Sequence, residues 1–482
     1  NLPHPPTLKE ERNPTRRDPY DSSQTRSENR GQRSRPAATT GTTIPTDLGR
    51  SGPGGSWQPV ADRVPPGPAG LPLIGNLDAY ERDRLGFLTH CARAYGDVAR
   101  YSDKVYVVSH PRLVEQILVG TNHTFLVAFN LLRRHGRDDP TMWMRQRRAA
   151  LRGLQHAAVA AFAERVATHA DALAGSWRPG ELRPVVADME RITSGVVAEY
   201  CASGQGSRLP GLAAVRLDAL FPVVSGPLRV PHRLPSPANL RVSWALGRPN
   251  RELRRLIAGR VQHPNERDLL GVLLTACPPL DEQAVCQTLV SILLASHGVP
   301  AAALAWVWYL LACHPAVEQR LHDELTCTLA GRAPTGEDLS VLPFTKAVVK
   351  EALRLYPPTW LAVRRVAAAC DLDGYPLIPG QAVLFSSYVL HRDPRWHPDA
   401  DRFLPERWLD GTTDRLPRCA YLPFGAGPRY CPGATLAMAE LVLATAAIGR
   451  RVRLRLPAGA RVRADARRTL VPHRLTMRAQ PR

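Results

Sequence analysis

The longest apolar stretch of this chain, residues 284–313, contains two residues that oppose helix formation. Gly298 and Pro300 stand near its middle, in the sequence LLASHGVPAAALAW. Glycine weakens a helix through its backbone entropy, and proline lacks the N–H that bonds the preceding turn. Polar residues also interrupt the stretch, so it predicts a buried core helix rather than a membrane span. A helix of this length requires a large core around it.

Composition and charge narrow the class of protein. The 482 residues are 44% hydrophobic, which is enough for one large domain. The formal charge of +20 comes mainly from scattered arginines without a zinc-finger or RNA-binding signature, so we expect no nucleic-acid partner. A basic face that docks an acidic protein is the preferred interpretation. Nine cysteines without a CxxC pair argue against a disulfide framework and for a reducing, cytoplasmic setting.

The chain divides into a tail and one domain. Residues 1–60 are rich in Arg, Pro, Ser, Thr and Gly, which predicts a disordered N-terminal tail. Neither a linker nor an internal repeat follows, so residues 61–482 are expected to form a single large domain. Periodicity predicts helices over 83–96, 142–175, 182–202, 238–262, 281–313, 315–330 and 344–356, and strands over 98–109, 382–390 and 474–479. The expected fold class is mainly α with small β-sheets.

The strongest chemical signal is the stretch FGAGPRYCPGATLAMA, residues 424–439. Gly425 and Gly427 allow tight bends beside Cys431. Arg429, two residues before the cysteine, and the dipole of the helical run that follows it should both favour the thiolate. A thiolate held in this way in an apolar loop suits an axial ligand of haem iron. The alternative is a glycine-rich turn with a structural cysteine.

This loop resembles the haem-binding loop of the cytochrome P450 family, and three further stretches support the resemblance. The family pattern F-x-x-G-x-R-x-C-x-G is filled by Phe424, Gly427, Arg429, Cys431 and Gly433. KEALRLYPP supplies E-x-x-R as Glu351 and Arg354, which share one face of a helix and can pair. The third member of that family cluster is Arg407, in FLPERW. WMRQR supplies the W-x-x-x-R of Trp143 and Arg147.

The resemblance covers about residues 60–480 and implies a cytochrome P450 fold, haem b as the cofactor and oxidoreductase activity of the monooxygenase type. It makes Cys431 the iron ligand, and two buried haem propionates would then need polar and cationic partners. Those partners would be Trp143, Arg147, Arg364 and Arg429. Arg364 is preferred to Arg365 because of its spacing from Trp360. Phe424, Gly425 and Gly433 would complete the haem-binding residues, while Glu351, Arg354 and Arg407 would be structural.

The central helix departs from the family's oxygen-activating motif. Where the family has A-G-x-[D/E]-T, this chain has Ala295, Ser296, His297, Gly298, Val299 and Pro300. Gly298 replaces the acid and Val299 replaces the alcohol, so the pair that delivers protons to oxygen through water is missing. Pro300 cannot donate to the Ser296 carbonyl, so we expect a kinked helix and a free carbonyl at that point.

Several interpretations of this departure stay open. In the first, a small apolar natural-product intermediate that already carries an N–O or O–O bond forms an iron-bound nitrene or oxene equivalent, which cyclises or inserts. An apolar pocket without a relay suits such group transfer. In the second, a conventional O₂-dependent monooxygenase hydroxylates or epoxidises through a substitute water relay at Ser296, the freed carbonyl or His297. The chain can also be a non-catalytic haem carrier or sensor, or the change of motif can be neutral.

The remaining predictions concern the iron potential, the partners and the location. Pro432 lacks an N–H that could bond the sulfur, which predicts a lower iron potential. A basic face for an acidic ferredoxin-type partner is expected from Arg145, Arg148, Lys346 and Lys350. Arg133 or Arg134 is a candidate for binding a substrate carboxylate. The sequence has neither a recognisable secretory signal nor a membrane anchor, so we expect a cytoplasmic bacterial monomer.

Overall fold

The computed structural model describes residues 63–72, 74–127, 140–154, 156–203, 251–261, 268–277 and 279–482. For residues 140–143 and 156–161 it describes the backbone alone. All of these residues belong to one compact unit, Pro59–Arg482. The tail predicted for residues 1–60, and most of the helix expected over 238–262, lie outside the described residues.

Helices dominate the described residues. They are α1 (Leu77–Arg82), α2 (Arg84–Tyr95), α3 (Pro111–Val119), α4 (Pro140–Gly153), α5 (His156–Ser176), α6 (Val185–Ala202), α9 (Leu269–Leu274), α10 (Glu282–Ser296), α11 (Val299–Cys313), α12 (Pro315–Leu329), α13 (Pro343–Leu355), α14 (Ser387–Leu390) and α15 (Ala434–Gly449); residues 251–261 are also helical. Local sequence sets several ends. The Asp281 side chain accepts the Ala284 N–H at 2.6 Å and caps α10, and prolines begin α3, α12 and α13.

The strands of the described residues form four small sheets. They are β1 (Val98–Ser102), β2 (Val105–Val108), β3 (Phe125–Val127), β4 (Leu182–Pro184), β5 (Leu361–Val366), β6 (Cys370–Leu372), β7 (Tyr375–Leu377), β8 (Ala382–Ser386), β9 (Val452–Arg455), β10 (Arg463–Asp465), β11 (Val471–His473) and β12 (Thr476–Pro481). The largest sheet has the order β1-β2-β8-β5-β3, in which only β2 and β8 run parallel. The expected strand over 382–390 is partly wrong, because α14 begins at Ser387.

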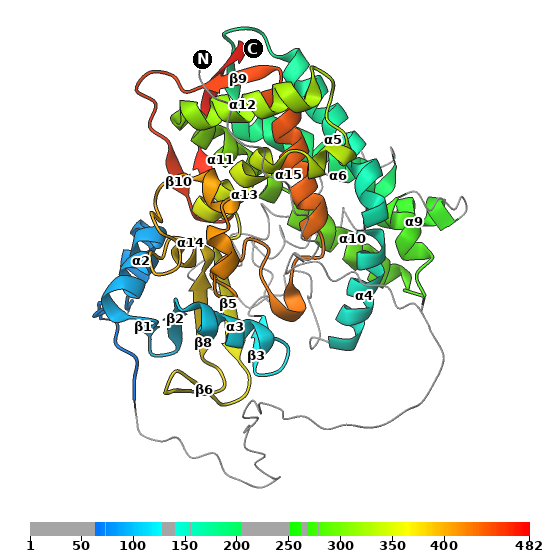
Figure 1. The fold of residues 1–482 in the computed structure, drawn as a ribbon. Coiled ribbons are helices and arrows are strands. Elements are labelled where there is room, and N and C mark those ends of the chain that lie inside the picture. Colours follow the sequence, from blue (N-terminus) through cyan, green and yellow to red (C-terminus); the bar gives the residue numbers. More distant parts are fainter. Residues whose placement is uncertain are drawn as a thin grey trace, which may run out of the picture. The chain divides into compact units, whose positions relative to one another are not determined.

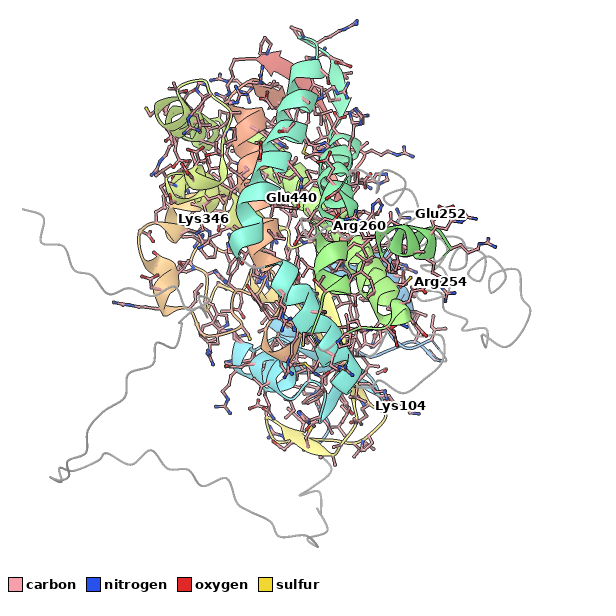
Figure 2. The ribbon with its side chains drawn as sticks, turned by 90° about the vertical axis from the view of Figure 1, so that its right-hand side faces the viewer. Lys104, Glu252, Arg254, Arg260, Lys346 and Glu440 are labelled. Atoms are coloured by element: carbon pink, nitrogen blue, oxygen red, sulfur yellow. The ribbon has the colours of Figure 1, made fainter. Side chains whose placement is uncertain are left out.

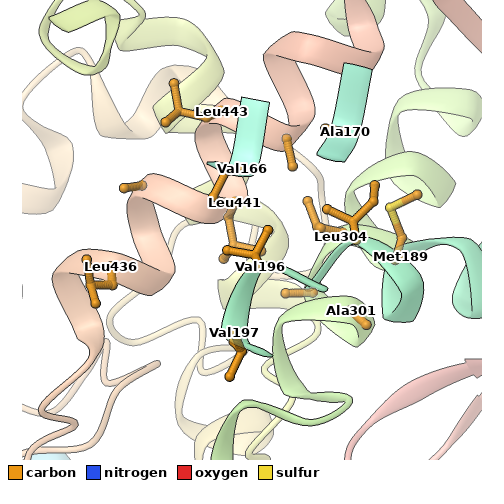
Figure 3. Packing of buried hydrophobic residues seen from close by; sticks show 14 of the residues in the cluster. Val166, Ala170, Met189, Val196, Val197, Ala301, Leu304, Leu436, Leu441 and Leu443 are labelled. Carbon is orange, nitrogen blue, oxygen red and sulfur yellow. The ribbon is translucent and has the colours of Figure 1, made fainter. Parts of the chain in front are cut away.

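The core lies where α5, α6, α11 and α15 meet, apart from the largest sheet (Figures 1 and 3). α15 is apolar along almost its whole length, as expected for a helix surrounded by other helices. Buried members of this core that are labelled in Figure 3 include Val166 and Ala170 of α5, Met189 and Val196 of α6, and Ala301 and Leu304 of α11. The fold class predicted from the sequence, mainly α with small sheets, is confirmed.

The apolar stretch that was expected to form one kinked helix over 281–313 forms two helices. The whole stretch Glu282–Cys313 is apolar and long enough to cross a membrane, and 56% of its most apolar window is buried. α10 ends at Ser296, and Gly298 then adopts a φ angle of 77° before α11 begins. Pro300 is the second residue of α11, where its missing N–H has no helical partner to lose. The interruption therefore lies at the glycine, before the proline.

Candidate active site

The loop that precedes α15 folds back on itself and holds Cys431 just before that helix. The Cys431 N–H donates to the Phe424 carbonyl at 3.0 Å. Gly425 and Gly427 have φ angles of 72° and 67°, in the left-handed region that glycine adopts without strain. A Cβ on Gly427 would lie 2.5 Å from the Leu118 carbonyl oxygen of α3. The backbone conformation around the cysteine thus explains why residues 425 and 427 are glycines.

The protein alone does not favour the ionised thiol of Cys431. Burial raises its pKa, and this effect outweighs the hydrogen bond from the Gly433 N–H and the charge of Arg147. The sequence predicted that Arg429 would favour the thiolate, but the cation that acts on Cys431 is Arg147. The Arg429 guanidinium donates to the Asn122 side chain at 2.8 and 3.0 Å. A metal cation deprotonates a thiol that coordinates it, so ionisation of this thiol should accompany metal binding.

Arg364 is a buried cation whose hydrogen-bond partners are neutral. It lies on β5 with 9% of its surface exposed, while the adjacent Arg365 is exposed. Its guanidinium donates to the Thr121 hydroxyl at 3.2 Å and to the Val363 carbonyl at 3.0 Å. Burial and the nearby charge of Arg429 lower its pKa to about 10. A buried cation with neutral partners is stabilised by a nearby anion, so the position of Arg364 suits a carboxylate of a prosthetic group.

Arg147 approaches the cysteine loop from α4. Its guanidinium donates to the Tyr430 carbonyl at 2.6 Å, one residue before Cys431. Burial lowers the pKa of this arginine, and the charge of the cysteine opposes that effect. Trp143 belongs to the same helix, but its side chain lies outside the described residues. α4, which carries Trp143 and Arg147, therefore reaches the cysteine loop.

Glu351 lies at the centre of a buried cluster. Its carboxylate accepts two hydrogen bonds from Arg354, at 2.8 and 2.9 Å, and one from Arg407 at 3.0 Å. The Leu404 N–H and the Trp408 indole N–H add bonds of 3.0 and 2.9 Å. Burial opposes ionisation of Glu351, but its bonds and the charges of the two arginines outweigh that penalty, so its pKa lies below the ordinary value. The structure thus brings together the three residues that the sequence assigned to this cluster.

The break between α10 and α11 exposes backbone acceptors. The carbonyls of Ala295, Ser296 and His297 accept no hydrogen bond from another residue in the described part of the chain. The Ser296 hydroxyl donates to its own helix, at the Ile292 carbonyl 2.7 Å away. Ala295 is exposed, and the residues from Ser296 to Val299 are half-buried. The segment that replaces the family's acid and alcohol therefore offers carbonyl oxygens to water or to a ligand.

The residues predicted for a basic face differ in exposure. Arg148 on α4 and Lys346 on α13 are exposed, and Lys346 is labelled in Figure 2. Arg145 is half-buried, as is Lys350, whose ammonium lies 5.4 Å from the centre of the Trp408 ring. The candidates for carboxylate recognition, Arg133 and Arg134, lie outside the described residues.

Sequence reasoning missed several residues that support this site. Thr121 and Asn122 follow α3 and receive the guanidinium groups of Arg364 and Arg429. His391 donates to or accepts from the backbone on both sides of its ring, as described below. None of these residues belongs to one of the motifs described above. Asn122 has a φ angle of 83°, and asparagine adopts this left-handed conformation more readily than most residues, so its residue type suits the turn.

A cysteine held in a tight loop with arginines near it is the arrangement expected of a thiolate-ligated haem protein. Comparison with known proteins agrees. The family model for Cytochrome P450 matches residues 250–477. The chain is 33% identical over 416 residues to Cyclooctat-9-en-7-ol 5-monooxygenase of Streptomyces melanosporofaciens, covering 80% of this chain and 89% of that protein. It is 34% identical over 439 residues to Cyclooctatin synthase of the same organism, covering 86% and 95%.

The chain therefore belongs to the cytochrome P450 family, and it is a haem-thiolate oxidoreductase of the monooxygenase type with haem b as its cofactor. Pentalenene oxygenase of Streptomyces avermitilis is a further relative, 29% identical over 440 residues, covering 86% of this chain and 97% of that protein. Among solved structures, retinoic acid bound cyanobacterial CYP120A1 shares the fold, with a TM-score of 0.76 at 22% identity, over 87% of this chain and 99% of that chain.

Proposed function

We propose that this enzyme uses O₂ to oxidise a cyclic terpenoid, with water at the break between α10 and α11 replacing the acid–alcohol relay. The relatives named above include a monooxygenase of cyclooctat-9-en-7-ol and an oxygenase of pentalenene. They cover most of this chain, which favours a related apolar, polycyclic substrate. Substrates of this kind carry few groups that could replace a missing proton donor. The relay would then have to come from the protein.

The observation that carries this proposal is the set of carbonyl oxygens at the break. O₂ activation at haem iron, which the bound cofactor supplies, needs protons that reach the distal side through ordered water. The carbonyls of Ala295, Ser296 and His297 have acceptor capacity left in the described structure, so they could order that water. Gly298 contributes the bend that frees them, and Val299 and Pro300 begin the next helix. Within this segment, His297 is the titratable residue and Ser296 is the residue with a hydroxyl group.

The haem-binding residues are proposed from the geometry of the cysteine loop and of the arginines near it. We propose Cys431 as the iron ligand, with Phe424, Gly425 and Gly433 shaping its loop. The propionates would be bound by Trp143, Arg147, Arg364 and Arg429. The buried cation at Arg364 supports this assignment, because a carboxylate would compensate its charge.

Electron delivery would use the basic face of Arg145, Arg148, Lys346 and Lys350. An acidic ferredoxin-type protein is the partner that such a face would steer toward the cysteine side. Weakening of reduction by salt, and by Lys346→Glu, is the expected behaviour. The full chain with a purified ferredoxin and its reductase would test this assignment.

A second function, group transfer from a substrate that already contains an N–O or O–O bond, is favoured by one observation. Gly298 and Val299 leave the position of the family's acid and alcohol without a side-chain proton donor. Such a reaction needs neither O₂ nor a relay, and an apolar segment over the iron would suit it.

Turnover with isotope-labelled O₂ separates the two functions. The holoenzyme is incubated with cyclic terpene hydrocarbons and alcohols, with a ferredoxin system, in the presence and absence of O₂. Incorporation of labelled oxygen that requires both O₂ and reductant supports monooxygenation. Conversion of an N–O or O–O substrate under anaerobic conditions without reductant would replace that proposal with group transfer.

The relay itself is tested by the coupling ratio, which is the product formed per reductant consumed. Val299→Thr restores an alcohol of nearly the same shape, and Val299→Ala is the matched control without a hydroxyl. Because the carbonyls already order water in our proposal, the threonine variant should change coupling little relative to alanine. A large gain that is specific to threonine would contradict a relay built from the break.

A further inference from the structure

Two buried histidines lie between the Glu351 cluster and the cysteine loop. His391 directly follows α14 and is fully buried, and His397 is 1% exposed in the turn beyond it. Their rings lie 6.5 Å apart. The ring of His391 also packs against Tyr421, at 5.2 Å between centres. Neither histidine has a role in the haem site or the basic face described above.

Both ring nitrogens of His391 contact the backbone. The Leu422 N–H donates to Nε2 at 2.9 Å, which requires an unprotonated Nε2. Nδ1 lies 3.2 Å from the Arg354 carbonyl, so Nδ1 carries the proton and donates it to that oxygen. His397 is the opposite tautomer, because its Nε2 lies 3.0 Å from the Ala420 carbonyl. The two rings therefore bond the backbone of the same short segment. His391 accepts from Leu422, and His397 donates to Ala420.

The residues joined by His391 are already fixed at both ends. On one side, the Arg354 guanidinium donates to the His391 carbonyl at 2.8 Å and pairs with Glu351. On the other side, Leu422 lies at the start of the cysteine loop and takes part in the backbone hydrogen bonds that shape it. Its carbonyl accepts the Gly425 N–H at 3.1 Å, and the Cys431 N–H closes the loop on Phe424. The imidazole is thus a link of two hydrogen bonds between α13 and the base of the loop.

We propose that His391 is a positioning residue for the haem ligand: its neutral imidazole fastens Leu422 to α13 and thereby keeps Cys431 in place on the iron. A protonated ring would have two donors, and the Leu422 N–H would lose its acceptor. The surroundings keep the ring neutral. Burial, followed by the positive charges that His397, Arg354 and Arg392 can carry, holds the pKa of His391 well below its ordinary value. A hydrogen bond of the Nδ1–H to the Arg354 carbonyl fits that neutral state.

An isosteric pair of variants isolates the two hydrogen bonds from the space that the ring fills. His391→Asn keeps one donor and one acceptor, and His391→Leu has the same shape with neither. The readout is the ferrous carbon monoxide spectrum of the holoenzyme, which distinguishes haem with the thiolate from haem that has lost it. The rate of thiolate loss on mild warming is then measured for each variant.

We expect His391→Leu to lose the thiolate about tenfold or more faster than the wild type, because a buried N–H and a buried carbonyl are left without partners. The asparagine variant should stay within a few-fold of the wild type. The matched control is His397→Leu, which removes a bond to a carbonyl outside the loop; it should lower the temperature of unfolding and change the rate of thiolate loss by less than about twofold.

Three results would overturn the proposal: a leucine variant that keeps the thiolate as long as the wild type, an asparagine variant as poor as leucine, or equal effects at positions 391 and 397. If His391→Leu gives no folded holoenzyme, NMR of isotope-labelled histidine nitrogens in the diamagnetic ferrous carbon monoxide form decides the question. A proton on Nδ1 of His391 and on Nε2 of His397 upholds the proposal. Any other protonation of His391 at neutral pH refutes it.

Discussion

The cluster around Glu351 and the break between α10 and α11 use opposite means to fix a conformation. Glu351 accepts hydrogen bonds from Arg354, Arg407, Leu404 and Trp408, so several interactions independently define its place. At the break, one glycine with a positive φ angle sets the course of the chain, and three carbonyls remain open to water or ligand. Loss of one bond should therefore matter differently on the two sides.

In the proposed enzyme, this difference would separate the part that holds the cofactor from the part that meets the substrate. The cysteine side must keep one geometry whatever the substrate is. Buried paired charges maintain that geometry, because removal of one partner of such a pair is strongly destabilising. The side with the break needs acceptors whose partners can change. A backbone bend supplies them without a side chain whose charge or shape limits the substrate.

The largest effect is expected from Glu351→Ala. Removal of one member of a buried ion pair leaves Arg354 and Arg407 as uncompensated charges, which costs about 3–5 kcal/mol. The variant should unfold at much lower urea concentration and contain little haem per chain. The matched control is Glu406→Ala, because Glu406 pairs with Arg320 at 2.8 Å and both side chains are about half exposed. Equal losses in the two variants would contradict the contrast drawn here.

An effect of opposite sign, which depends on pH, is expected from Glu440→Gln. Glu440 of α15 is buried, its Oε1 has no hydrogen-bond partner, and burial raises its pKa to about 8. The folded state therefore binds more protons than the unfolded state between about pH 4.5 and 8, so stability falls as pH rises through this range, by at most about 1.4 kcal/mol per pH unit. Urea midpoints of wild type and variant should agree near pH 5, and glutamine should be the more stable at pH 8.

A wild-type stability that does not change over this pH range would contradict the raised pKa of Glu440. It would mean that the Glu440 carboxylate has a hydrogen-bond partner, and the cysteine side would then be more fully bonded than the structure indicates. Figure 2 shows this residue on α15, away from the exposed Lys346 of α13. The Glu351 carboxylate is the internal comparison, since its pKa lies below the ordinary value and it should add nothing to the slope above pH 5.

The two regions also differ in how far the sequence could predict them. The Glu351–Arg354–Arg407 cluster and the cysteine loop depend on residue types at fixed spacing, and the motif search found their members. The break was expected as a kink at Pro300, but the structure places it at Gly298, because a left-handed glycine ends one helix before the proline begins the next. Proline at the second position of a helix causes no distortion, so its presence alone could not locate the break.

Other parts escaped the sequence for equally physical reasons. Short strands such as β6 and β10 have too few residues for a clear alternation, and Ser387 starts a helix directly after β8. Thr121 and His391 contribute through hydrogen bonds to partners far away in the chain. A motif records spacing along the chain, so contacts of this kind have no signal in it. The helices α12 and α13, with prolines at their first positions and regular apolar faces, were predicted to within about two residues.

Gly298→Ala tests whether the bend is required by the backbone. An L-residue in the left-handed region costs about 1–2 kcal/mol, and no described residue lies within 4 Å of a Cβ at this position, so backbone strain is the expected cause of destabilisation. The control Gly175→Ala, in α5 with open space and an ordinary φ, should be neutral or stabilise by up to about 1 kcal/mol. Urea midpoints and the coupling ratio measure both properties. A neutral Gly298→Ala that leaves coupling unchanged would mean that the break is not needed.

The smallest expected effect concerns the charge on the sulfur. The Gly433 N–H already bonds Cys431, and Pro432 removes the other N–H that follows the ligand. Pro432→Ala restores that donor, which can draw electron density from the sulfur and raise the reduction potential of the iron. Spectroelectrochemical titration of the holoenzyme measures the change, with Pro428→Ala, in the same loop but before the ligand, as the control. A potential that is unchanged or lower in Pro432→Ala would mean that the alanine N–H does not reach the sulfur, and Gly433 would then supply the backbone N–H that bonds it.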